Sequence, residues 1–126
     1  MKLILFSILL LILTGCHQST QPDNCGSFKN GKFMEVYGDT LHITIDRKGG
    51  QQVETSELGT SHYKITWLSE CEYESQLLET TIDYAQKWIG KRYKIIILST
   101  SKKGYSFSCQ MEGKDLVVES SVVKVE

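Results

Sequence analysis

The chain has 126 residues, with 14 basic and 15 acidic side chains and a formal net charge of −1. Charge this close to neutral and this evenly scattered excludes nucleic-acid binding, which requires a basic face. The length allows one domain and excludes two, and the many Val, Ile, Thr and Tyr residues favour strands over helices.

The chain begins with a short apolar leader. Lys2 precedes an apolar run over residues 3–13, and two small residues then lead to Cys16. This layout is typical of a secretory signal. The run is too short for a transmembrane helix, which needs about 20 apolar residues. We therefore predict a signal peptide over residues 1–15.

The last residues of this leader, Leu-Thr-Gly followed by Cys16, resemble the lipobox of bacterial lipoproteins. The resemblance implies cleavage before Cys16, a diacylglycerol thioether on its sulfur and acylation of its new amine. Several acyl chains, at about 0.8 kcal/mol per buried methylene, make such anchoring effectively permanent. The alternative is an ordinary secretory signal. His17, and not Asp, follows the cysteine, which favours an exported protein held at the outer membrane. No acidic cluster of the kind that marks surface display follows directly behind the cysteine in the sequence, which favours the periplasmic face.

A polar tether over residues 16–24, which includes Cys16, leads to a β domain over residues 25–126. Turn signals recur in this domain every ~8–12 residues, as in antiparallel all-β folds. Between the turns apolar and polar residues alternate, as in Leu41, Ile43 and Ile45. We predict a single small antiparallel up-and-down barrel or curled sheet of about eight strands.

Two hairpins have faces that constrain their register, because a slip of one residue turns a strand inside out. In the first, Trp67 lies opposite Tyr73, which places Cys71 at the edge of the connecting loop. In the second, we expect the pairs Ile97–Tyr105, Ile95–Phe107 and Tyr93–Cys109.

If Cys16 carries lipid, three cysteines remain, and three pairings are possible in principle. The register places Cys109 inside the core, where a cysteine behaves as a small buried hydrophobe. We therefore predict a Cys25–Cys71 disulfide and a free thiol at Cys109.

One segment departs from the strand rhythm. Thr80 and Asp83 have the spacing of a capping box, and Gly90 is a stop signal. Apolar residues between them recur at helical spacing. We predict one short helix near residues 81–89, lying across an opening of the barrel.

The titratable residues do not form a catalytic or metal-binding motif in this sequence. Glu70, Glu72 and Glu74 alternate along one strand, as expected for a solvated outer face. The three histidines, His17, His42 and His62, are not at ligand spacing. We therefore expect no catalytic residue, no metal, no cofactor and no enzymatic activity.

Candidate binding residues are aromatic or apolar. Trp67, Tyr73 and Trp88 belong to an aromatic set that either fills the barrel or lines a cavity for a small apolar ligand. Ile96 and Leu98 point away from the core face, where the short helix covers them or they form a patch for a protein partner.

The run from Cys25 to Phe33, followed by Trp67-Leu68-Ser69-Glu70-Cys71-Glu72-Tyr73, resembles a group of short, uncharacterised bacterial lipoproteins. They share a Cys-x-x-Phe-Lys-x-Gly-x-Phe opening and a Trp-x-Ser-acid-Cys-Glu-Tyr core. The resemblance implies an anchored domain and no reaction. Both cysteines of the predicted disulfide belong to this pattern.

Two functions remain from the sequence alone. The first is a non-enzymatic lipoprotein, held to the membrane through Cys16, whose β domain binds an envelope protein. The alternative is a small lipocalin-like carrier of an apolar ligand.

Overall fold

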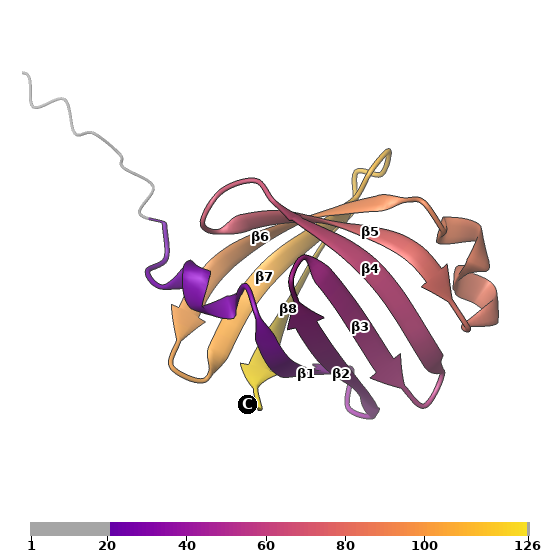
Figure 1. Ribbon diagram of the computed structural model, residues 1–126, viewed down its shortest axis with the longest axis horizontal. Helices are drawn as coiled ribbons and strands as arrows, with labels where there is room; N and C mark the ends of the chain where they lie inside the picture. Colours follow the sequence, from indigo (N-terminus) through magenta and orange to yellow (C-terminus); the bar gives the residue numbers. More distant parts are fainter. Residues whose placement is uncertain (1–20, 126) are drawn as a thin grey trace, which may run out of the picture.

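The computed structural model describes residues 21–125, and in them eight antiparallel strands form a closed barrel in which each strand pairs with its neighbours in the chain (Figure 1). The strands are β1 (Gly31–Tyr37), β2 (Leu41–Lys48), β3 (Gln51–Ser56), β4 (Gly59–Trp67), β5 (Glu72–Thr80), β6 (Arg92–Ser101), β7 (Gly104–Met111) and β8 (Val117–Lys124). Two short 3-10 helices accompany them, η1 (Cys25–Phe28) and η2 (Asp83–Trp88). The predicted all-β up-and-down barrel is confirmed. The leader and Cys16 lie outside the described residues.

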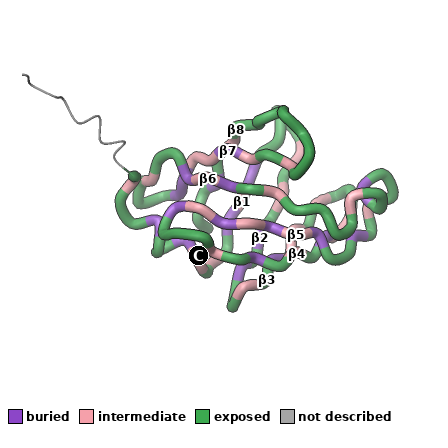
Figure 2. Tube along the Cα trace, turned by 90° about the horizontal axis from the view of Figure 1, so that it is seen from above, coloured by how far each residue is buried: buried purple, intermediate pink, exposed green. Residues whose placement is uncertain are grey.

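The barrel closes where β1 meets β8, through the pairs Phe33–Lys124 and Met34–Val123. Closure removes the exposed edges that an open sheet would present to other chains. Buried and exposed residues alternate along the strands (Figure 2) because successive side chains point to opposite faces. The buried apolar residues include Phe33, Ile45 and Ile97.

Of the two predicted hairpin registers, the structure confirms one and contradicts the other. Trp67 lies opposite Tyr73 in β4 and β5, as predicted. In β6 and β7 the predicted pairs are wrong: Ile97 lies opposite Phe107, and Cys109 lies opposite Ile95. The main cause is the position of the turn: Ser101 lies opposite Gly104, so the connection is Lys102-Lys103, further along the chain than the predicted pairs require. An extra residue in β6 between Ile97 and Ser99 then shifts the register by one residue, which brings the inward side chains of the two strands opposite each other. The faces are unaffected, so Cys109 still points inward.

The predicted helix near residues 81–89 is the shorter 3-10 helix η2, and Thr80 is not its N-cap. Thr80 is the last residue of β5, and its hydroxyl accepts a hydrogen bond from the backbone N–H of Ile82 at 3.1 Å. The same hydroxyl is 2.8 Å from Ser61 Oγ, across the β4–β5 pair. Sheet pairing therefore holds this threonine in the strand. Within residues 21–125, no helix has the length and apolar character needed to cross a membrane.

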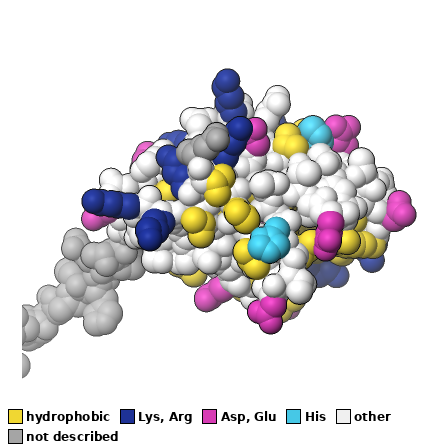
Figure 3. Space-filling model, turned by 90° about the horizontal axis from the view of Figure 1, so that it is seen from below, with side chains coloured by type: hydrophobic (Ala, Val, Ile, Leu, Met, Phe, Trp, Pro, Cys, Tyr) yellow, Lys and Arg dark blue, Asp and Glu magenta, His cyan; other side chains and the backbone are white. Residues whose placement is uncertain are grey.

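The two ends of the barrel differ. Helix η1 lies at one end, here called the closed end, and η2 lies at the other, here called the open end. The described chain starts at the closed end, where basic side chains gather (dark blue in Figure 3). The lysines at or next to the strand ends there are Lys29, Lys32, Lys48, Lys102, Lys103 and Lys124.

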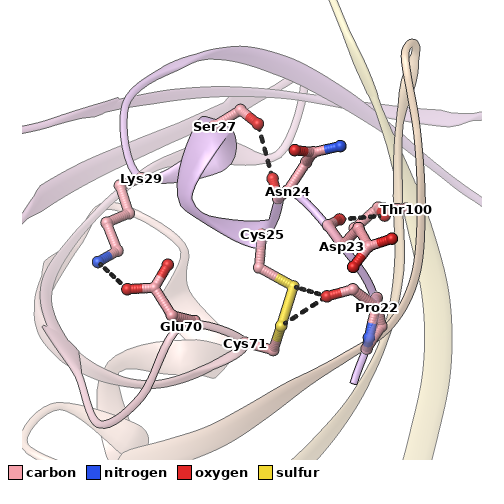
Figure 4. The surroundings of a disulfide bond; sticks show 9 residues. All are labelled: Pro22, Asp23, Asn24, Cys25, Ser27, Lys29, Glu70, Cys71 and Thr100. Carbon is pink, nitrogen blue, oxygen red and sulfur yellow. Dashed lines mark hydrogen bonds and ion pairs between the residues drawn. A yellow bond between two sulfur atoms is a disulfide. The ribbon is translucent and has the colours of Figure 1, made fainter. Parts of the chain in front are cut away.

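The predicted Cys25–Cys71 disulfide is confirmed, with a Cα–Cα distance of 5.2 Å. It joins η1 to the loop between β4 and β5 (Figure 4). The carbonyl oxygen of Pro22 lies 3.4 Å from Cys71 Sγ, and the Thr100 hydroxyl donates a hydrogen bond to the carbonyl of Asp23. The segment before η1 is thus held against β6 as well as against the disulfide.

Candidate functional site

The barrel contains a cavity of about 620 Å³, which opens at the end covered by η2. Residues from all eight strands line it, and Ile82, Ala85 and Trp88 of the η2 segment lie at its mouth together with Tyr37 and Leu116. The volume is within the range of roughly 300–1,000 Å³ that is usual for small-molecule sites. The aromatic and apolar side chains in the wall include Ile43, Tyr63, Tyr93, Ile95 and Phe107.

A buried arginine forms the floor of this cavity. Arg47 Nε donates to Gln52 Oε1 at 2.7 Å, and Nη1 donates to the carbonyl of Phe28 at 2.8 Å. Nη2 donates to the hydroxyls of Tyr73 and Tyr105, at 3.0 and 2.8 Å. Only 1% of Arg47 is exposed. Each of its nitrogens therefore has a partner inside the protein.

Aromatic rings surround the same guanidinium. Arg47 Cζ lies 4.8 Å from the centre of the Tyr73 ring and 5.1 Å from that of Phe33. Such cation–π contacts are strongest when water is excluded. Burial raises the pKa of Tyr73 well above its ordinary value, although the charge of Arg47 opposes this. The Tyr73 phenol therefore stays neutral and can both accept from Arg47 and share a proton with Tyr105, 3.1 Å away.

Local sequence explains why an arginine points inward. Arg47 is two residues after Ile45 in β2, on the same face of the strand. The predicted alternation ended at Ile45 and did not include Arg47. Extending it by one step predicts an inward arginine. The partners Gln52 and Phe28 have no comparable signal, because only the closed barrel brings η1 and β3 together at this point.

Two carboxyl groups that were not among the predicted site residues also line the cavity. Glu35 in β1 is opposite Ile43 of β2, and Glu54 in β3 is opposite Ile45 of β2. Strand β2 therefore separates the two acids, and both point into the same space.

Burial dominates the chemistry of these acids. It raises the pKa of Glu35, which is 7% exposed, although the Ser120 hydroxyl partly offsets this by donating to Glu35 Oε1 at 2.8 Å. Burial also raises the pKa of Glu54 to about 7. A hydrogen bond from Tyr63 and the charge of Arg47 act against this increase, and repulsion from Glu35 adds to it.

Cys109 is the free thiol, as predicted, and it is half-buried in the cavity wall. Burial raises its pKa to about 11, and the nearby Glu35 and Glu54 charges add to this. At neutral pH the thiol is therefore protonated and a poor nucleophile.

The five predicted binding residues lie in different places. Tyr73 is in the cavity floor and Trp88 is at the mouth. Trp67 packs on the Tyr73 ring at 4.7 Å. Ile96 is on the outer face of β6, opposite Glu72, and Leu98 is 44% exposed in a groove at the closed end, beside Pro22 and Phe28.

The acidic residues on and beside β5 form ion pairs on the outer surface. Glu70 is 3.5 Å from Lys29, Glu72 is 3.8 Å from Lys94, and Glu74 is 3.4 Å from Arg92. Exposed pairs of this kind contribute up to about 1 kcal/mol each. In the described part of the chain, no three His, Cys, Asp or Glu side chains are grouped so as to hold a metal ion.

Comparison of the chain with protein-family models, with curated proteins and with solved structures finds no match. The class of protein is therefore defined by the structure itself. It is a closed eight-stranded β-barrel with the Cys25–Cys71 disulfide and an internal cavity that has an arginine floor.

We predict that Arg47→Met destabilises the protein by about 3–5 kcal/mol, because the substitution leaves two phenols, an amide and a carbonyl buried without their donor. Urea unfolding measures the free-energy difference. Arg92→Met is the matched control, because the exposed side chain of this arginine pairs with Glu74 at the surface, and its loss is expected to cost less than about 1 kcal/mol. Equal effects of the two substitutions would contradict this role of Arg47.

The raised pKa of Glu54 makes stability dependent on pH. Between its ordinary pKa of 4.5 and its folded value of about 7, the folded protein binds more protons than the unfolded chain, so this residue lowers stability as the pH rises. We expect Glu54→Gln to gain stability relative to the wild type between pH 5 and pH 8, by up to about 3 kcal/mol. Urea unfolding across this range tests it, with Glu119→Gln on the exposed outer face of β8 as the control.

Proposed function

We propose that this chain is an exported, lipid-anchored binding protein whose barrel holds a small molecule. The observation that carries the proposal is the cavity of about 620 Å³, with its aromatic wall and its mouth beside η2. A barrel that is only structural gains stability by filling its interior with side chains, because protein interiors are normally close-packed. A cavity with polar groups placed inside an apolar wall is the usual form of a ligand site.

The cavity favours the carrier over the envelope-interaction module. The partner patch proposed from the sequence consists of Ile96 and Leu98, and Leu98 lies in a groove with the segment before η1. That pair is much smaller than a standard protein interface, which buries about 800 Å² per partner. A non-enzymatic role also fits the cavity, since Cys109, its only thiol among the described residues, is held protonated.

Attachment through Cys16 gives the barrel an orientation. The described chain begins at the closed end, so an anchor five residues before residue 21 would hold this end toward the membrane. The lysines of the closed end (Figure 3) suit an anionic lipid surface. The cavity mouth then faces away from the membrane, where a ligand can enter from the periplasm.

The cavity proposal is tested with N-phenyl-1-naphthylamine, a neutral dye that becomes fluorescent in apolar surroundings. We expect the chain from residue 17 onward, which keeps the whole described barrel, to bind one dye molecule. Cys109→Trp should fill the cavity and reduce dye affinity at least tenfold, whereas Leu98→Trp on the outer surface should leave it unchanged. Both variants are first checked for cooperative unfolding. Equal dye binding by both would place the dye outside the cavity and reject the proposal.

The anchor is tested in cells fed with labelled palmitate. We expect label on the wild-type protein and none on Cys16→Ser, which should also remain unprocessed because the lipoprotein signal peptidase requires the lipid-modified cysteine. Cys109→Ser is the matched control and should be labelled normally. Absence of label on the wild type, with normal processing of Cys16→Ser, would show that the leader is an ordinary secretory signal.

A further inference from the structure

We propose that the cavity selects a cation: a small amphiphile with a protonated amine, whose ammonium group lies between Glu35 and Glu54 while its apolar body contacts the aromatic wall. This inference rests on the proposed function, because it names the chemical class of ligand for the same cavity.

The two acids are placed to hold one positive charge from two sides. Glu35 projects inward from β1 and Glu54 from β3, with Ile43 and Ile45 of β2 between them. Glu35 is held by the Ser120 hydroxyl at 2.8 Å, so its orientation is fixed before a ligand arrives. Buried charges are usually paired, yet neither acid has an ion pair among those found within residues 21–125. A ligand cation would supply the missing charge.

The cavity is poorly suited to an anion, although a cation forms its floor. Arg47 is 1% exposed, and its nitrogens donate to Gln52, Phe28, Tyr73 and Tyr105, so a ligand carboxylate cannot reach the guanidinium without breaking these bonds. The other basic residue that lines the cavity in the described chain is Lys114, which is exposed in the loop after β7.

The wall around the acids suits the rest of such a ligand. Tyr63, Tyr93 and Phe107 line the cavity, and Trp88 lies at its mouth. Aromatic rings pack against apolar chains, and their faces also attract ammonium groups, most strongly where water is excluded. An alkylamine or arylalkylamine combines both features, whereas an alcohol of the same length offers only the apolar part.

Binding of an ammonium group has a consequence for protons. The titratable groups that interact with Glu54 come from six strands: Glu35 of β1, Arg47 of β2, Tyr63 of β4, Tyr73 of β5, Tyr93 of β6 and Cys109 of β7. An ammonium beside Glu54 favours the carboxylate, so a protonated Glu54 releases its proton to solvent when the ligand enters. Since a pKa of about 7 leaves Glu54 mostly protonated at pH 5 and mostly ionised at pH 8, binding should strengthen over this range.

The experiment is displacement of N-phenyl-1-naphthylamine at pH 8 by three ten-carbon molecules that differ only in head group: decylamine, decanol and decanoate, each below its micelle concentration. We expect decylamine to displace the dye at a concentration at least tenfold lower than decanol, and decanoate to be the weakest. The advantage of decylamine over decanol should fall at least tenfold at pH 5.

Two isosteric variants identify the groups responsible. Glu35→Gln and Glu54→Gln should each reduce the advantage of decylamine over decanol at least fivefold, with both molecules measured on the same variant. Glu119→Gln removes an acid from the outer face of β8 and should change none of these values.

The outcomes separate this inference from the proposed function. Failure of the dye to bind would reject the cavity as a ligand site. Dye binding with equal displacement by the three molecules would leave the carrier standing and overturn the selection of a cation. Stronger displacement by decanoate would likewise overturn it and assign the ligand to the positive charge of Arg47.

Discussion

The guanidinium of Arg47 holds the closed end of this barrel together. From its place in β2 it bonds to the carbonyl of Phe28 in η1, the amide of Gln52 in β3 and the phenols of Tyr73 and Tyr105 in β5 and β7. A charge this deep is stable only when its donors are satisfied. The requirement to satisfy them fixes the position of η1, and the Cys25–Cys71 disulfide secures η1 from the other side.

This floor divides the interior into two unlike parts. On one side Phe28, Phe33 and Tyr105 pack against one another, with ring centres 5.1–6.2 Å apart, and close the barrel. On the other side the strands continue without an equivalent plug, and η2 lies beside the mouth and does not fill the barrel. The cavity therefore exists because the polar floor stops the packing of the closed end partway along the strands.

The same arrangement sets a conflict between stability and binding. Burial penalises the ionised forms of Glu35 and Glu54. Without a ligand, these two acids therefore lower the stability of the folded protein most at the pH at which they carry charge. Replacing either acid with an apolar side chain of similar size would remove this penalty. The cost is consistent with a functional site, where groups are placed for a ligand at the expense of the folded state. A cation bound between the acids would reverse it.

The sequence by itself determined the β class, the inward and outward faces of most strands, and the disulfide. These follow from period-two alternation and turn spacing, which are local properties. It also contained the signal for Arg47, in the step after Ile45. Only the tertiary structure decided the β6–β7 register, because period-two alternation fits the predicted and the observed pairs equally well, and the turn at Lys102-Lys103 and the extra residue at Leu98 leave no signal in it. The tertiary structure alone also created the cavity, because Glu35 and Glu54 share one enclosed space only after β1 and β8 have closed the barrel.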